Sequence, residues 1–353
     1  MNFDRMPLTF AIALSTLALS CTRQVNDPTK TTQSAASPST ELVSGFSLGS
    51  DISWAQQMYA TGRRWKNPDG VEEGLPTMFK KFSQTAISLR VWVNPSSDPS
   101  NGHCSPAEVA DEAAIYYSAG YKISVCCHYG DTWNSVGTQN PPAAWAGYNY
   151  DQMKAAMVAH VLDVMNRLKA KGVTPTWFKN GNEINRGVVG SVGSVSNPAQ
   201  MAGLLNACYD AAKSVFPNIK VIIHTGQPQN AAANTFWQRF TANGGKFDVM
   251  GFSSYAQSTN IPGVFNAIKT LQATYGPTKP VIQVEYGGPW NRAYTATSLR
   301  TWIANISSLP NSSNGGVWYW EPECYNWNGY QSGAFDATTL MPSSGIMQAF
   351  NNN

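Results

Sequence analysis

The chain has few charged residues, and its basic residues do not cluster. Asp, Glu, Lys and Arg make up 13% of the 353 residues, and 24 basic against 21 acidic residues leave a net charge of +3. Nucleic acids and acidic membrane surfaces attract clustered Lys and Arg. The sequence therefore gives no support to a protein that binds either of them.

Cysteine is also scarce, and the six cysteines show no zinc or redox spacing. Cys126 and Cys127 are adjacent in an apolar run. Successive side chains of a strand point to opposite faces and rarely bridge each other. We expect buried thiols, which leaves room for one disulfide elsewhere.

No apolar run is long enough to span a bilayer as a helix. Residues 7–20 are apolar but short, and they stand between Arg5 and Cys21, as the core of an export signal does. Residues 17–21 (LALSC) resemble a bacterial lipobox, so residues 1–21 are expected to end in lipidation of Cys21 or in ordinary cleavage nearby. Polar residues 22–42 are expected to be a disordered linker, and the protein to be exported, as a surface or outer-membrane lipoprotein or as a secreted protein.

Aromatic and small polar residues are abundant instead. Twelve Trp and fifteen Tyr accompany many Asn, Ser and Gly residues. Such a composition suits a polar, uncharged ligand that stacks on rings and exchanges hydrogen bonds, as sugars do.

Eight β-prone runs alternate with seven helical patterns along the remaining chain. The predicted strands are residues 46–48, 87–93, 121–127, 177–179, 220–224, 247–253, 280–285 and 316–320. The predicted helices are residues 75–84, 106–119, 150–171, 198–216, 233–242, 264–275 and 298–308. This alternation predicts one α/β domain over residues 43–353, a (β/α)8 TIM barrel. An open doubly wound sheet is disfavoured because no Gly-rich phosphate loop follows the first strand.

Two glutamates lie at or just beyond the carboxyl ends of predicted strands. Glu183 follows the fourth strand within residues 180–185 (NGNEIN), and Glu285 ends the seventh within residues 281–287 (VIQVEYG). The active site of a barrel lies at the carboxyl ends of its strands. Glycosidic bonds are cut by two carboxyl groups, one that protonates the leaving oxygen and one that attacks or activates water. The pair therefore indicates glycoside cleavage, although an acid in a helix's first turn would explain Glu183 alone.

Six separated motifs carry a resemblance to a known family. They are residues 49–54 (GSDISW), 89–95 (LRVWVNP), 128–133 (HYGDTW), 181–185 (GNEIN), 284–285 (VE) and 319–322 (YWEP). Together they resemble the motifs of glycoside hydrolase family 53, the endo-β-1,4-galactanases, over about residues 45–350. The sequence departs from the family pattern at Cys126-Cys127, where Asp-Phe is usual, and at Lys179-Asn180, where Gln-Val is usual.

The resemblance implies roles for particular residues. Glu183 would be the acid/base and Glu285 the nucleophile of a retaining hydrolysis of β-1,4-galactan. Arg90 would keep Glu285 ionised, and Tyr255 would donate a hydrogen bond to it. Asn182 would hold the sugar's 2-hydroxyl.

The remaining substrate-binding residues implied by the resemblance are polar groups of the cleft and stacking platforms. They are Asp51, His128, Asp131, Trp54, Trp133, Trp290 and Trp320. We expect a monomer that needs no cofactor. Some bacterial relatives bind a structural calcium near the last strand, but the sequence assigns no ligands for it.

Two other functions stay open at this point. A β-1,4-mannanase or cellulase of the same barrel clan also places glutamates at the fourth and seventh strands. A surface lipoprotein that binds glycans on a non-catalytic barrel is the alternative from another class, and the retention of Glu183 and Glu285 argues against it.

Overall fold

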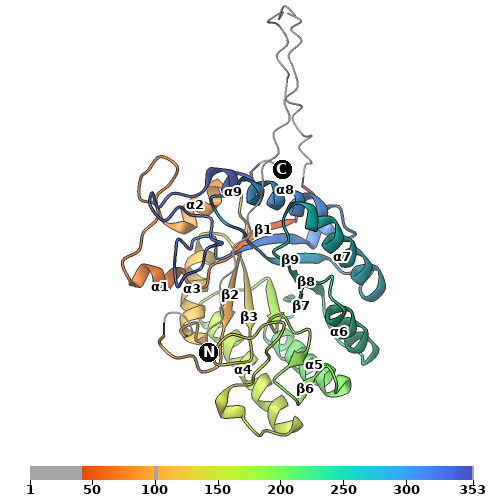
Figure 1. Cartoon of the computed structure of the whole chain (residues 1–353). Helices are drawn as coiled ribbons and strands as arrows, with labels where there is room; N and C mark the ends of the chain where they lie inside the picture. Colours follow the sequence, from red (N-terminus) through yellow and green to blue (C-terminus); the bar gives the residue numbers. More distant parts are fainter. Residues whose placement is uncertain (1–41, 99–101, 352–353) are drawn as a thin grey trace, which may run out of the picture. The chain divides into compact units, whose positions relative to one another are not determined.

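Eight parallel strands close into a barrel. In Figure 1 the strands lie at the centre of the molecule, with helices around them. The computed structural model describes residues 42–98 and 102–351. Around the barrel the strand order is β1, β10, β9, β8, β7, β4, β3, β2. The strands are β1 Ser47–Asp51, β2 Ala86–Val91, β3 Lys122–Cys127, β4 Trp177–Asn180, β7 Lys220–Gly226, β8 Val249–Ser253, β9 Val281–Tyr286 and β10 Gly316–Trp320. The predicted barrel is confirmed.

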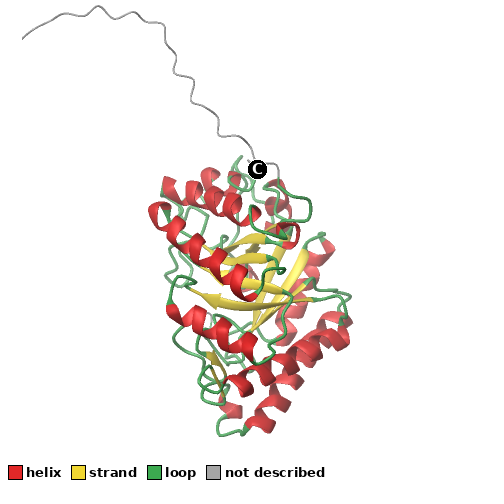
Figure 2. Cartoon of the chain, turned by 90° about the vertical axis from the view of Figure 1, so that its right-hand side faces the viewer, coloured by secondary structure: helices red, strands yellow, loops and turns green. Residues whose placement is uncertain are grey.

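Helices surround the barrel, red around the yellow strands in Figure 2. They are α1 Ala55–Ala60, α2 Leu75–Lys81, α3 Pro106–Ser118, α4 Tyr150–Ala170, α5 Pro198–Val215, α6 Ala231–Ala242, α7 Ile261–Tyr275, α8 Ala293–Ser307 and α9 Ser344–Gln348. The seven predicted helices are all present. Two begin where local signals are strong, since Ser105 with Glu108 and Asn149 with Gln152 form capping boxes for α3 and α4.

Among the described residues, only short elements were not predicted from the sequence. Helices α1 and α9 have six and five residues, too few to show a helical period. Strands β5 Gly187–Val188 and β6 Gly193–Ser194 form a two-stranded antiparallel pair that follows β4. Three 3-10 turns, η1 Ala143–Trp145, η2 Ser258–Asn260 and η3 Ser312–Asn314, complete the elements.

Apolar side chains fill the interior of the barrel beneath the carboxyl ends of its strands. This interior cluster consists of Ala86, Trp177, Ile222, Val249, Ile282, Val284 and Trp318. The rings of Trp177 and Trp318 meet edge to face at 5.2 Å. Because side chains of a strand alternate, Lys179 points to the same side of β4 as Trp177, one layer nearer the carboxyl end. A larger apolar cluster packs the helices against the strands.

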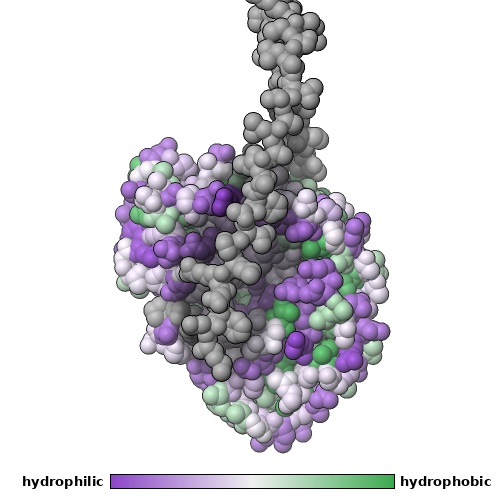
Figure 3. Space-filling view, viewed as in Figure 1, coloured by the Kyte–Doolittle hydropathy of each residue, from purple (hydrophilic) through white to green (hydrophobic). Residues whose placement is uncertain are grey.

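The surface of the described part is mixed, as Figure 3 shows for one face. Large exposed apolar side chains such as Val71 and Ile115 are scattered along the sequence. Five cysteines lie in the described part, and each is a buried free thiol, as expected. Across residues 42–98 and 102–351, no helix has the length and apolar character of a membrane span. The predicted export signal and linker lie outside the described residues, up to residue 41.

Candidate active site

Glu183 and Glu285 line one cavity at the carboxyl ends of the strands. Its volume is about 200 Å³. Nine of the twelve predicted site residues line it: Asp51, Arg90, His128, Trp133, Asn182, Glu183, Tyr255, Glu285 and Trp320. Asn134, Ser135 and Lys179 also line it and were not predicted. Residues from seven different strands and loops therefore converge as the barrel prediction required.

A second, wider cavity of about 780 Å³ adjoins the first, because Glu183 and Tyr255 line both. It extends past Ser253 and Gln227 to the start of α7 at Val264. A cleft that continues beyond the two glutamates offers room for more than one unit of a polymer.

The turn after β4 holds Glu183 in an uncommon conformation. Its φ of 49° lies in the left-handed region, which strains a residue with a side chain. Contacts with β7 fix this turn: the Glu183 N–H donates to His224 Nδ1 at 3.3 Å, and the Ile184 N–H donates to the His224 carbonyl at 2.9 Å. The amide of Asn185 makes two further hydrogen bonds with the backbone of Gly226, at 2.7 and 2.8 Å.

The Glu183 carboxylate is held from two sides. The Ser253 hydroxyl donates a hydrogen bond to Oε1, and the Val136 N–H donates to Oε2 at 3.2 Å. Gly226 lies directly beneath, where an added Cβ would come within 2.5 Å of Oε1. The carboxylate is thus positioned by a hydroxyl, an amide and a close backbone approach.

A bulge in β9 turns Glu285 into the cavity. Ile282 and Val284 both belong to the interior cluster, so regular alternation would point Glu285 outward to the helices. The register skips one residue of β9 against both β8 and β10 at this point. A bulge reverses the alternation and re-aims the next side chain, and such bulges are frequent beside active sites.

Glu285 contacts a cation and a phenol. Lys179 Nζ lies 3.8 Å from Oε1, and the Tyr255 hydroxyl donates to Oε2 at 3.3 Å. Burial raises the pKa of Glu285 to about 8. Lys179 and the hydrogen bond from Tyr255 oppose this rise, whereas the nearby carboxyl groups of Glu183 and Asp51 add to it. The charge of Glu285 therefore depends on Lys179.

The role predicted for Arg90 is wrong. Its guanidinium forms a buried ion pair with Glu321, which directly follows β10. Glu321 also accepts a hydrogen bond from the backbone N–H of Trp54 at 3.2 Å. The Arg90 guanidinium lies over the rings of Trp54 and Trp133, at 4.8 and 4.6 Å from their centroids. A sequence cannot show which carboxylate a buried arginine meets, and here Glu321 takes Arg90 while Lys179 takes Glu285.

Three predicted site residues do not line the 200 Å³ cavity. Trp54 is buried and packs its ring against Trp133 and Trp320, which do line it, at 5.8 and 5.4 Å. Asp131 accepts the N–H groups of Asn94 and Ala143, at 3.0 and 2.9 Å. Trp290 is partly buried in the loop after β9. Trp54 and Asp131 therefore support the site from outside the cavity.

The structural calcium that some bacterial relatives bind can be compared with one group of side chains that follows β10. In the described residues, Glu321, Glu323 and Cys324 bring their ligand atoms within 4.8 Å of one another. Calcium takes six to eight oxygen ligands, whereas this group includes a thiol and Glu321 already pairs with Arg90. The group does not fit calcium.

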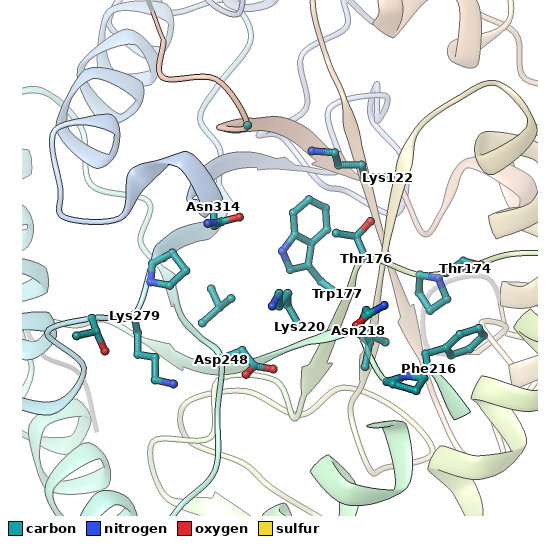
Figure 4. A pocket seen from close by; sticks show the side chains of 17 residues that line it. Lys122, Thr174, Thr176, Trp177, Phe216, Asn218, Lys220, Asp248, Lys279 and Asn314 are labelled. Atoms are coloured by element: carbon teal, nitrogen blue, oxygen red, sulfur yellow. The ribbon is translucent and has the colours of Figure 1, made fainter. Parts of the chain in front are cut away.

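Another cavity, of about 570 Å³, opens at the opposite end of the barrel (Figure 4). Lys122, Trp177 and Lys220, the first residues of their strands, line it together with Lys279. Its single carboxylate, Asp248, pairs with Lys213 at 2.8 Å. A cavity with one engaged carboxylate cannot supply an acid and a nucleophile, so the site at the carboxyl ends is the catalytic candidate.

Comparisons with known proteins agree with this geometry. The profile of glycosyl hydrolase family 53 matches residues 47–298. An arabinogalactan endo-beta-1,4-galactanase of Thermothelomyces thermophilus is 26% identical, over 74% of this chain and 84% of the relative. One from Cellvibrio japonicus is 27% identical, over 78% of this chain and 80% of the relative.

Solved structures share the fold. The Ignisphaera aggregans GH53 catalytic domain superposes with a TM-score of 0.80 at 24% identity, over 89% of this chain and 98% of that domain. A structure from a study of two fungal beta-1,4-galactanases gives a TM-score of 0.76 at 24% identity, over 86% of this chain and 98% of that chain. With the family profile matched over most of the barrel, the chain belongs to glycosyl hydrolase family 53 and is a glycoside hydrolase.

Proposed function

We propose that the protein is a retaining endo-β-1,4-galactanase in which Glu183 is the acid/base and Glu285 the nucleophile. The observation that carries the proposal is the pair itself: two glutamates from the ends of β4 and β9 face one cavity in a family 53 barrel. The relatives named above as endo-beta-1,4-galactanases support the choice of substrate.

The reaction proceeds in two displacements. Glu183 donates its proton to the glycosidic oxygen while a Glu285 oxygen attacks the anomeric carbon, so the glycosidic bond breaks and a glycosyl ester forms. Glu183, now ionised, then takes a proton from water, whose oxygen attacks the same carbon. The ester bond breaks, its electron pair returns to Glu285, and Glu183 is protonated again.

Neighbouring residues give each glutamate its role. Ser253 and Val136 fix the orientation of the Glu183 carboxyl, and Lys179 and Tyr255 face Glu285. Asn182 donates to the Asn134 carbonyl at 3.0 Å and keeps a second amide hydrogen for a sugar hydroxyl. This contact strengthens towards the oxocarbenium-like transition state when the hydroxyl is at carbon 2.

Galactose carries an axial oxygen at carbon 4, where glucose and mannose carry an equatorial one, and mannose also has an axial 2-hydroxyl. In β-1,4-galactan the axial oxygen links the units, so the chain coils. A cleft whose polar groups pair with a particular hydroxyl loses transition-state stabilisation when that hydroxyl is misplaced, since buried partners are left unsatisfied. Trp133 and Trp320 supply rings on which the apolar face of galactose can stack.

A panel of polysaccharides tests the proposal. The purified protein should release short β-1,4-galacto-oligosaccharides from linear galactan, with an early fall in viscosity, and Glu285→Gln should abolish the release. Little activity is expected on β-mannan, carboxymethyl cellulose or β-1,3-linked galactan. Comparable initial rates on mannan or cellulose would overturn the substrate. Binding of galactan without cleavage would favour a glycan-binding protein instead.

We further propose that the enzyme acts outside the cytoplasm, anchored through Cys21. Support comes from the sequence, where the apolar run of residues 7–20 precedes this cysteine. A polymeric substrate that cannot cross a membrane fits this location.

A further inference from the structure

Lys179 is a buried lysine that the family resemblance does not explain. Its side chain is 1% exposed and enters the barrel above the interior cluster. Nζ lies 3.8 Å from Glu285 Oε1 and 4.0 Å from Asp51 Oδ2. A buried ammonium is costly unless anions compensate it, so Glu285 and Asp51 are its compensation.

The other titratable groups that face Lys179 or Glu285 are neutral or engaged elsewhere. Burial lowers the pKa of His128 and of His224, and Lys179 lowers both further, so the imidazoles are neutral. Burial raises the pKa of the Cys126 thiol to about 12, and Tyr255 is a hydrogen-bond donor. Arg90 is paired with Glu321.

Lys179 therefore stands alone in its role among the described residues. Within residues 42–98 and 102–351, Lys179 is the only cation that forms an ion pair with Glu285, whereas Glu183 and Asp51 carry the same charge as Glu285 and raise its pKa. Burial works against the charge on Lys179, but the groups around it, Glu285 and Asp51 among them, raise its pKa above the ordinary value.

The two departures from the family pattern lie side by side. Cys126 on β3 and Lys179 on β4 are register partners in the barrel. In the family pattern the corresponding residues are Asp and Gln, a carboxylate beside a neutral amide. In this chain they are Cys126 and Lys179, a thiol beside an ammonium. The floor of the site thus carries a positive charge next to Glu285.

We propose that Lys179 is a positioning residue whose ammonium faces Glu285 Oε1 and favours the ionised form of this carboxyl group over its protonated form. This inference rests on the proposed role of Glu285 as nucleophile. The Lys179 ammonium stabilises the Glu285 carboxylate before it attacks. It also stabilises the same carboxylate as the leaving group when water cleaves the ester.

The ionisation of Glu285 can be measured without any substrate. Protein labelled with ¹³C at the glutamate carboxyl carbons is titrated by NMR, and the Glu285 signal is assigned by its loss in Glu285→Gln. The comparison uses Lys179→Gln, Lys179→Met and the charge-retaining Lys179→Arg, each checked for folding by circular dichroism.

Removing the charge should raise the pKa of Glu285 by more than about one unit, whereas Lys179→Arg should leave it within ~0.3 units. Asp51→Asn keeps Lys179 and should lower the pKa of Glu285, because an anion that competes for Lys179 is gone. A pKa that is unchanged in the folded neutral variants, or that rises in Asp51→Asn, overturns the proposal.

The pH dependence of hydrolysis gives the second readout. Because Glu285 must be ionised to attack, the acidic limb of kcat/KM on galactan should move to higher pH in Lys179→Gln, by the shift that NMR measures. An unmoved limb in an active variant contradicts the role of Lys179. Failure of the wild type to cleave galactan would refute the proposed function and leave the NMR result to decide on Lys179.

Discussion

Gly226 offers a sharp test of how Glu183 is positioned. In Gly226→Ala the new Cβ would lie 2.5 Å from Glu183 Oε1 and 2.6 Å from Val136 Cγ2, whereas ordinary contacts begin at 3.4 Å. The carboxylate must therefore move by about 0.9 Å from the position in which the Ser253 hydroxyl holds it. A misplacement of ~1 Å can cost about 100-fold in rate, or about 2.7 kcal/mol of transition-state stabilisation.

The assay is kcat/KM on soluble galactan, with thermal unfolding recorded for each variant. Gly137→Ala is the matched control, because Gly137 follows Val136 in the same loop and an added Cβ there meets nothing within 4 Å. We expect Gly226→Ala to lose about 100-fold in kcat/KM, and Gly137→Ala to match the wild type. A folded Gly226→Ala protein with wild-type kcat/KM would refute the assigned position of Glu183.

Two further predictions concern stability and location. Arg90→Met leaves Glu321 buried without its cation, so the free energy of unfolding in urea should fall by about 3–5 kcal/mol. The exposed pair of Arg167 and Asp163 provides the control, and Arg167→Met should leave the unfolding midpoint unchanged. An equal effect of both substitutions would show that the buried pair contributes nothing special. Expressed with its own signal in a bacterial host, the protein should partition with membranes, and Cys21→Ser should release it or block its maturation. Equal membrane retention of both forms would exclude the lipid anchor.

The barrel could be predicted from the sequence because its signals are local and repeated. Apolar runs such as Ile87 to Val91 alternate with capped amphipathic helices such as α4, and each signal needs only neighbours along the chain. The places of Glu183 and Glu285 followed from the same alternation, since Glu183 lies just beyond one predicted strand and Glu285 ends another.

The environment of the two glutamates could not be predicted, because it depends on contacts between distant strands. The bulge that turns Glu285 inward is visible only in the register of β9 against β8 and β10. Arg90 meets Glu321 across 231 residues of sequence. The sequence shows Lys179 as an unusual polar residue shortly before Glu183. Its contact with Glu285 could not be predicted from this, because the closed barrel brings the two side chains together.

The stereochemistry of hydrolysis tests the central claim most directly. Proton NMR can follow the anomeric signals in the first minutes of cleavage of a β-1,4-galacto-oligosaccharide, before mutarotation mixes them. Two displacements at Glu285 predict that the new reducing end appears first as the β-anomer. Initial release of the α-anomer would show a single displacement by water, and would contradict the assignment of Glu285 as nucleophile.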